Sequence, residues 1–338
     1  MMRAFTTLTL AAVLGLGVGS AGPGVETALA AGEKPLFPTW GWKTNFKKHS
    51  VSYEEIFSGG PPKDGIPAAD KPKFVSQESA DKWVKDIEPV VVVEHRGKAK
   101  AYPLQILTWH EIVNDTLNGL PVTVTFCPLC NAAIAFDRRL DGRLLDFGTT
   151  GKLRYSDLVM YDRQTESWWQ QFTGAAIIGD LTGRKLKMVP AALVGYGHFR
   201  KSYPGAPVLS KDTGHRRPYG RNPYVGYDNI KGVPFLFRGP TDKRLPPMER
   251  VVAVTLGDRD KAYPYSVLAK RRVVNDRIGS RGVVVFHADG AASALGGPKI
   301  ASARDIGATG VFDPNLNGRK LTFQPDPKGI RDVQTGSR

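Results

Sequence analysis

The sequence predicts a strand-dominated α+β fold made of two related β-rich repeats, each with one short helix, joined by a long irregular connection. Three observations support this prediction. A segment that begins at Val91 aligns without gaps with a segment that begins at Val252. Each copy consists of short apolar runs separated by polar or glycine-containing turns, which is typical of antiparallel strands. In each copy a Tyr-Pro pair precedes a run with helical apolar spacing, and proline suits the first turn of a helix.

The repeat rests on identical residues at a single spacing. Lys100-Ala101-Tyr102-Pro103 falls on Lys261-Ala262-Tyr263-Pro264, and Asn114-Asp115 falls on Asn275-Asp276, in both cases 161 positions later. A looser likeness continues beyond these segments, where residues 162–172 resemble residues 313–323. Self-similarity of this kind indicates a structural unit that occurs twice.

The chain begins with features of a secretory signal peptide, assigned to residues 1–30. A basic residue, Arg3, precedes an apolar stretch, and small residues end the segment at Ala28-Leu29-Ala30. This pattern predicts cleavage near Ala30 and a periplasmic or secreted protein. No later segment approaches the roughly 20 apolar residues that a membrane-spanning helix needs. Residues 31–88 contain "SGGPPKDGIPAAD" and are expected to be irregular.

The remaining boundaries follow from the repeat. We assign residues 89–190 to the first repeat, 191–250 to a Pro-, Gly- and Tyr-rich connection, 251–325 to a degenerate second repeat and 326–338 to a tail. The formal net charge is +15, which favours contact with an anionic envelope surface. The basic residues are spread out, so no nucleic-acid-binding patch is predicted, and the sequence identifies no protein partner.

The two copies differ where chemistry would be expected. Trp109-His110-Glu111 becomes Lys270-Arg271-Arg272, and Cys127 and Cys130, the only two cysteines, align with alanines at positions 288 and 291. Both copies need the same packing residues, so residues found in one copy alone are candidates for function. The sequence therefore predicts a site in the first repeat.

The "CPLC" turn permits three interpretations. A strand that ends in Cys-Pro-x-Cys, followed by a left-handed residue such as Asn131, directs both sulfurs into one hollow, where they suit one transition metal ion, Zn or Cu. The pair could instead be redox-active, although the residues after Cys130 predict a strand rather than the helix whose N-terminus usually activates such a thiol. A structural disulfide across the turn is the third interpretation.

The helix before the cysteines supplies the other candidates. His110 shares the inward face of this helix with Ile106 and Val113, so we expect it to be the third metal ligand or a proton-transfer group. Glu111 would point about 100° away and is expected to act as an acid or base, or to support a ligand. Trp109, Asn131, Arg154 and Trp168 are the residues expected to line a pocket.

Several phrases resemble a known family. They include "GGPPKDGIP", "AYPLQIL", "WHEIVND", "CPLCNAA", "FGTTG", "DRQTESWWQQFTG" and "YGRNPYVGYD". The sequence is similar to the exported bacterial proteins grouped as domain of unknown function 3179, over nearly all of the mature chain. This family is defined by sequence alone, so the resemblance implies no activity, cofactor or substrate.

Two functions remain open from the sequence. The first is an exported protein with a metal-binding or thiol-redox site at Cys127, Cys130 and His110, whose substrate and enzymatic status the sequence leaves undetermined. The alternative is a non-catalytic envelope binding protein in which the two cysteines form a structural disulfide.

Overall fold

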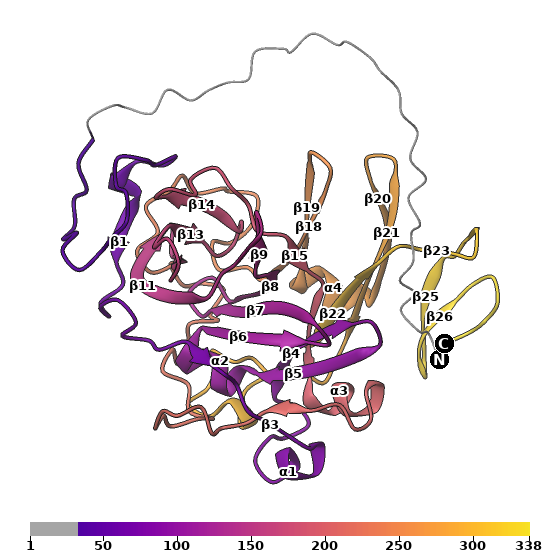
Figure 1. Ribbon diagram of the computed structural model, residues 1–338. Coiled ribbons are helices and arrows are strands. Elements are labelled where there is room, and N and C mark those ends of the chain that lie inside the picture. The colour runs from indigo at the N-terminus through magenta and orange to yellow at the C-terminus, as the bar shows by residue number, and fades with distance from the viewer. Residues whose placement is uncertain (1–32) are drawn as a thin grey trace.

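Strands dominate the structure, a computed structural model that describes residues 33–338. Strands hold 40% of the chain and helices 10%, which confirms the predicted strand-dominated α+β class. Residues 1–30, interpreted above as a signal peptide, lie outside the described residues. Figure 1 shows the strands in several separate sheets, with the longest helices lying beside them.

The front half of the molecule, residues 33–209, contains three five-stranded sheets. In sheet order the first holds β16 (Ala191–Gly195), β4 (Pro89–His95), β5 (Lys98–Pro103), β17 (Val208–Leu209) and β3 (Phe74–Val75). The second holds β15 (Met188–Val189), β8 (Ala132–Asp137), β7 (Leu120–Cys127), β6 (Ile112–Leu117) and β2 (Ala69–Asp70). The third holds β1 (Ile56–Ser58), β11 (Phe147–Arg154), β12 (Asp157–Asp162), β13 (Trp168–Gln170) and β14 (Ala175–Ile178). A small hairpin pairs β9 (Arg139–Leu140) with β10 (Arg143–Leu144), and the helices are η1 (Tyr53–Glu55), α1 (Gln77–Asp81), α2 (Leu104–His110) and α3 (Tyr196–Ser202).

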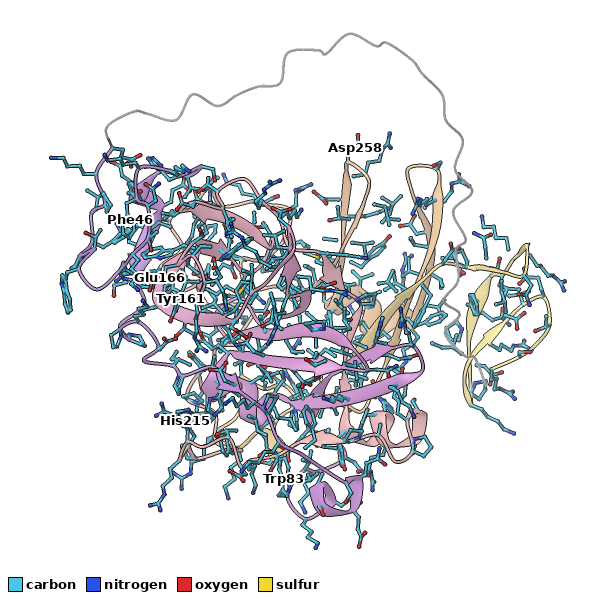
Figure 2. All side chains as sticks on the ribbon, in the orientation of Figure 1. Phe46, Trp83, Tyr161, Glu166, His215 and Asp258 are labelled. Carbon is cyan, nitrogen blue, oxygen red and sulfur yellow. The ribbon has the colours of Figure 1, made fainter. Side chains whose placement is uncertain are left out.

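The back half, residues 251–338, repeats part of this arrangement. It holds the pair β18 (Val251–Leu256) and β19 (Arg259–Pro264), helix α4 (Tyr265–Arg271), and the sheet β20 (Val273–Ile278), β21 (Arg281–Ala288) and β22 (Ala308–Phe312). Two further hairpins pair β23 (Asn315–Leu316) with β24 (Arg319–Lys320) and β25 (Phe323–Asp326) with β26 (Gly329–Asp332), and a short helix η2 spans Ile300–Ser302. The tip of the β18–β19 hairpin, marked by Asp258, projects from the molecule (Figure 2).

Matching hydrogen bonds show that the two halves fold alike. The Asn114 side chain bonds both backbone groups of Phe147, at 2.8 and 3.1 Å, and Asn275 bonds both of Phe323, at 2.8 and 2.9 Å. Tyr102 donates to Asp115 just as Tyr263 donates to Asp276. A spacing of 161 positions would pair Phe147 with residue 308, but these bonds make Phe323 the counterpart of Phe147. The looser likeness between residues 162–172 and 313–323 is therefore wrong.

The halves differ at two places that gapless alignment cannot show. The turn between β7 and β8 spans residues 128–131, whereas the corresponding loop between β21 and β22 spans residues 289–307. The β11–β12 hairpin covers 16 residues (147–162) and the β25–β26 hairpin covers 10 residues (323–332), so the second hairpin is six residues shorter. Cys127 still corresponds to Ala288, because these residues face Ala132 and Ala308 in equivalent registers. Cys130 lies in the short turn and has no single counterpart.

Two segments expected to be irregular contribute strands to the front half. Residues 31–88 provide β1, β2, β3 and helix α1, and residues 191–209 provide β16, α3 and β17. These additions explain why the Val90–Val93 run is buried on both faces: Val91 and Val93 pack in the cluster with α2, while Val90 and Val92 pack in the cluster with α3. Their counterparts in β18 are only partly covered.

Candidate metal centre

The "CPLC" segment forms a tight turn between two strands. Cys127 is the last residue of β7, and Cys130 lies just before β8. The Cys130 amide donates to the Cys127 sulfur at 3.4 Å. Asn131 has a φ of 49° and its amide donates to the Pro128 carbonyl at 3.1 Å, so the left-handed residue predicted after Cys130 is confirmed. Both cysteines are free thiols.

A carboxylate from a different hairpin completes the group. Among the residues that the structure describes, ligand atoms of Cys127, Cys130 and Asp157 all lie within 4.8 Å of one another. Asp157 begins β12, and its Oδ1 lies 3.0 Å from the Cys130 sulfur. Its Oδ2 accepts from the Phe172 amide at 2.9 Å, which orients the carboxyl group. Burial raises the pKa of Asp157 to about 6.

Asp157 was missed by sequence reasoning. The one hint within the described residues is that the β11–β12 hairpin is longer than the β25–β26 hairpin. The shorter hairpin has no residue that corresponds to Asp157. That difference becomes visible only once the register of both hairpins is known.

Glu111 approaches this group because helix α2 ends one residue before it. Its φ of 57° is left-handed, its amide donates to the Leu107 carbonyl at 2.6 Å, and its own carbonyl accepts from the Phe126 amide at 2.8 Å. The Glu111 side chain is 7% exposed. Burial, together with the nearby charge of Asp157, raises the pKa of Glu111 to about 8. The Glu111 carboxyl therefore lies close enough to Asp157 for the two charges to interact.

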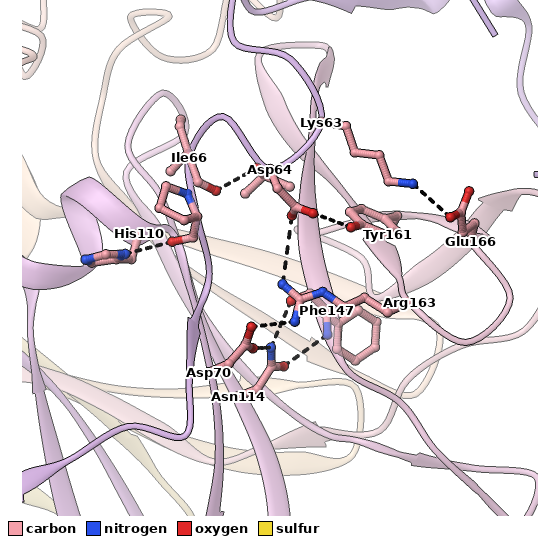
Figure 3. Close-up of polar contacts among 12 residues, drawn as sticks. Lys63, Asp64, Ile66, Asp70, His110, Asn114, Phe147, Tyr161, Arg163 and Glu166 are labelled. Atoms are coloured by element: carbon pink, nitrogen blue, oxygen red, sulfur yellow. Dashed lines mark hydrogen bonds and ion pairs between the residues drawn. The ribbon is translucent and has the colours of Figure 1, made fainter. Parts of the chain in front are cut away.

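His110 does not join the sulfurs, contrary to the expectation that it is the third ligand. Its Nδ1 lies 2.7 Å from the Pro67 carbonyl and its Nε2 lies 2.6 Å from the Tyr219 hydroxyl. Because a carbonyl can only accept, Nδ1 carries the proton and Nε2 accepts from Tyr219 in the neutral ring. Both nitrogens are thus engaged by protein groups, and the cluster of metal-ligating atoms contains Asp157 instead. Figure 3 shows His110 directed at the segment that carries Ile66.

The segment 63–70 that meets His110 is held by several polar contacts (Figure 3). Tyr161 donates to Asp64 at 2.5 Å, and Arg163 donates to Asp70 at 2.5 Å. The Asn114 amide also donates to Asp70, at 2.8 Å. These contacts fix the Pro67 carbonyl where the His110 ring can reach it, so His110 joins three distant parts of the chain.

We expect His110→Ala to lower the free energy of unfolding by about 1–3 kcal/mol, because it removes a buried side chain together with its hydrogen bonds to the half-buried Pro67 carbonyl and the Tyr219 hydroxyl. We expect metal content to stay unchanged. Urea denaturation and elemental analysis measure the two quantities. The exposed His215→Ala variant, whose ring lies 5.6 Å from that of His110, is the matched control and should leave both nearly unchanged. Loss of metal from His110→Ala alone would contradict this assignment.

The same residue should make stability depend on pH. Burial lowers the pKa of His110, and the charges of His215 and Arg217 lower it further, although the bond to Pro67 acts in the opposite direction. The unfolded chain, with a histidine pKa of about 6.5, then binds more protons than the folded chain. Stability is therefore expected to fall as the pH drops below about 6.5, and this component should be absent from His110→Ala.

The residues expected to line a pocket lie elsewhere, apart from Asn131. The Trp109 indole donates to the Arg221 carbonyl at 3.1 Å. Arg154 pairs with Glu55 at 2.6 Å. Trp168 is fully buried and stacks on Phe37 with ring centroids 5.2 Å apart. Asn131 remains beside the thiols, and its Oδ1 is a buried atom without a hydrogen-bond partner among the described residues.

A cavity of about 370 Å³ lies beside Glu111, and Cys127, Cys130 and Asp157 are not among the residues that line it. Glu111 lines it together with Leu129, from the cysteine turn, and Leu158, which follows Asp157. The opposite wall comes from the strap, which we define as residues 210–250, and includes Tyr224, Val225, Tyr227 and Phe235. The connection predicted from its Pro, Gly and Tyr content therefore covers the site.

The strap is attached at several points. Tyr219 bonds His110, and the Arg221 carbonyl accepts from Trp109. The Gly226 amide donates to the Gly296 carbonyl at 3.0 Å, which joins the strap to the loop 289–307 of the back half. The Ser156 hydroxyl, one residue before Asp157, bonds the Phe235 carbonyl. The strap is thus held directly over the residues that surround the thiols.

No helix within residues 33–338 combines the length and the apolar character needed to cross a membrane. No curated protein and no solved structure matches the chain. A family described as "Protein of unknown function (DUF3179)" matches residues 63–334, a range that includes both cysteines, Glu111, Asp157, the strap and most of the back half. With most of its length matched, this chain belongs to the DUF3179 family.

Proposed function

We propose that the protein is an exported metal-binding protein in which Cys127, Cys130 and Asp157 hold one transition metal ion, Zn²⁺ or Cu, beside Glu111. The observation that carries the proposal is the convergence of two sulfurs and a carboxylate oxygen within 4.8 Å, from two separate hairpins. Buried acidic groups gathered in this way are typical of sites that bind a cation.

The electrostatics support a bound cation. Burial raises the pKa of the Cys130 thiol, and Cys127 and Asp157 raise it further. Asp157 likewise raises the pKa of Glu111. The Cys130 thiol and the Glu111 carboxyl therefore both resist ionisation in this group. A cation at their centre would reverse these effects, because it stabilises each charged form.

The donor set fits a borderline metal. Thiolates favour Zn²⁺ and Cu⁺, whereas a carboxylate oxygen favours Zn²⁺ over the softer Cu⁺. The Cys130 amide already donates to the Cys127 sulfur, which stabilises a thiolate. Three protein ligands leave a position for a further ligand, as in catalytic zinc sites. When bound, such an ion supplies Lewis acidity and holds that further ligand in place.

The chain's own residues would then do two things at this site. The carboxyl of Glu111 lies at the wall of the cavity and can accept or donate a proton there. Tyr224, Tyr227 and Phe235 limit the access of water and provide apolar contacts for a small ligand.

Comparison of the two repeats also supports the proposal. In the back half Cys127 is replaced by alanine and Glu111 by Arg272, which pairs with Asp289 at 2.6 Å. Cys130 and Asp157 lie in a turn and a hairpin that are built differently there. The shared hydrogen bonds persist while every group of the proposed centre is lost, so these groups are not needed for the repeat to fold.

A thiol-redox pair is the second candidate, favoured by the presence of two free sulfurs in the same cluster. Its usual geometry is missing, since Cys127 ends a strand rather than beginning a helix.

Elemental analysis of protein purified from its native compartment, combined with thiol titration, tests the proposal. We expect about one metal ion per chain and thiols that react only after chelation. After cobalt substitution, thiolate-to-cobalt absorbance should report the sulfur ligands. Metal-free protein with two thiols that form a disulfide reversibly would favour the redox function. A stable disulfide with no metal would favour the non-catalytic envelope binding protein and overturn the proposal.

A further inference from the structure

The cavity beside Glu111 is enclosed by three parts of the chain. Leu129 comes from the cysteine turn, and Tyr224 belongs to the strap. Leu153 and Leu158 lie opposite each other on β11 and β12 and form a third wall. Most of the other side chains in the wall are also aliphatic or aromatic. A hollow that is mainly apolar and carries a few polar groups is typical of a binding site for a small molecule.

The cavity has the size and the opening that such a ligand needs. Its volume is about 370 Å³, whereas an apolar cavity of roughly 150 Å³ already holds a benzene molecule. Val225 and Phe235 of the strap line the cavity and are 57% and 49% exposed, so the cavity opens to the surface beside them. A molecule of about two rings can therefore enter along the strap.

Two polar side chains in the wall are available to this ligand. Among residues 33–338, neither the Tyr224 hydroxyl nor the Glu111 carboxyl hydrogen-bonds another residue, and none of their oxygens is sealed from open space. The Tyr227 hydroxyl, in contrast, accepts from the Phe235 amide at 2.8 Å. Burial raises the pKa of Tyr224, and the charges of Glu111 and Cys127 raise it further. The Tyr224 hydroxyl therefore keeps its proton and can donate it to an acceptor in the cavity.

The charges around the cavity favour a neutral ligand. Lys152 is the one basic residue in the wall, but it lies opposite Val159 on the face of β11 that packs on Phe37. Its Nζ is 5.9 Å from the centroid of the Phe37 ring, so an anion in the cavity would have no basic partner. A cation would be repelled by the metal ion of the proposed centre. Since an unpaired charge is costly to bury, a neutral molecule fits best.

We propose that this cavity binds a small neutral molecule with an apolar body of about two rings and one oxygen acceptor, to which the Tyr224 hydroxyl donates a hydrogen bond. An aromatic ketone is a simple compound of this class. The inference extends the proposed function to the class of ligand, and it rests on that function only where the charge of the metal ion excludes a cation.

The neutral naphthyl ketone Prodan is the probe, because its fluorescence shifts to shorter wavelength in apolar surroundings. We expect the full chain to bind one molecule saturably in a fluorescence titration. Tyr224→Phe should weaken binding about two- to tenfold, since it removes one hydrogen bond. Dimethylaminonaphthalene, which lacks the ketone, should bind the wild type and Tyr224→Phe equally. No saturable binding of Prodan, or the same effect of Tyr224→Phe on both probes, would overturn the proposal.

Two further variants locate the bound probe. Leu153→Trp fills the cavity from β11 and should weaken Prodan binding by about tenfold or more. Val233→Trp adds the same ring to the strap at a residue that is 81% exposed and lies outside the cavity, so it should bind like the wild type. Circular dichroism shows whether both fold. If Leu153→Trp does not, Val225→Trp narrows the opening instead and should have the same effect. Equal binding by the cavity variant and Val233→Trp would overturn the proposal.

Metal analysis of the same samples separates this inference from the proposed function. Cys127→Ser removes a proposed ligand but leaves the lining of the cavity unchanged, so it should lose the metal and still bind Prodan. Wild-type protein that holds metal but does not bind Prodan would overturn this inference alone. Metal-free wild-type protein that binds Prodan would overturn the proposed metal centre alone.

Discussion

Replacing Cys127 with serine is expected to reduce bound metal from about one ion per chain to the background level. Cys127 is 1% exposed, and its sulfur belongs to both the sulfur pair and the cluster with Asp157. A serine hydroxyl is a much poorer ligand for a borderline metal than a thiolate. Since loss of a group that merely supports a ligand costs 10–100-fold in affinity, loss of a ligand should cost at least about 100-fold. Elemental analysis and competition with a chelator measure the change.

The back half offers the matched control for this prediction. Ala288 occupies the position that corresponds to Cys127, at the same place in the strand register. Ala288→Ser introduces the same hydroxyl group and should leave metal content unchanged. Asp157→Asn keeps the shape of the third side chain and should weaken binding as Cys127→Ser does. If Cys127→Ser retained a full metal ion, the centre would lie elsewhere and the proposed function would fail.

Replacing Trp169 with alanine is expected to lower the free energy of unfolding by about 3–5 kcal/mol. Its side chain is fully buried in the cluster that holds Phe147, Met160 and Cys127. Its indole nitrogen also donates to Asp162 at 3.0 Å, so the substitution removes a hydrogen bond as well as leaving a cavity. Urea denaturation monitored by circular dichroism measures the loss.

A tryptophan at the surface provides the comparison. Trp40 is 85% exposed, so Trp40→Ala should change stability by no more than about 0.5 kcal/mol. A loss below about 1 kcal/mol for Trp169→Ala would contradict the packing described for β13.

Local patterns in the sequence predicted the features that depend on neighbouring residues. The strand-dominated class follows from short apolar runs and frequent turns, and the Tyr-Pro pair does precede a helix, although Pro103 is the extended residue before α2 rather than part of its first turn. The left-handed Asn131 follows from the geometry of the "CPLC" turn. Each of these features is set within a few residues of the chain.

Which residues form the centre depends on the end of helix α2 and on strand register, and local sequence patterns predict neither. Helix α2 ends at His110, and Glu111 adopts a left-handed conformation that is usual for glycine rather than glutamate. Because the helix ends at His110, the His110 ring bonds the Pro67 carbonyl. The carboxyl of the next residue, Glu111, lies near Asp157 instead. Asp157 comes from another hairpin, and only the register of the paired strands brings it to Cys130.

The alignment of the repeats failed for a similar reason. The gapless match holds as far as β21, because the shared hydrogen bonds require the same spacing. Beyond that point the loop 289–307 and the shorter β25–β26 hairpin shift the correspondence in opposite directions. Neither change leaves a pattern that hydrophobic spacing can reveal.

The loop 289–307 affects the order in which the molecule can assemble. Its residues Ala294 and Leu295 are buried in the cluster around Ile106 and Val124 of the front half. The Ala292 amide donates to the Ile87 carbonyl at 2.7 Å. A chain synthesised from its N-terminus therefore lacks part of the hydrophobic core of its front half until residue 295 has emerged. Because the two halves share this core, we expect them to unfold in a single cooperative transition.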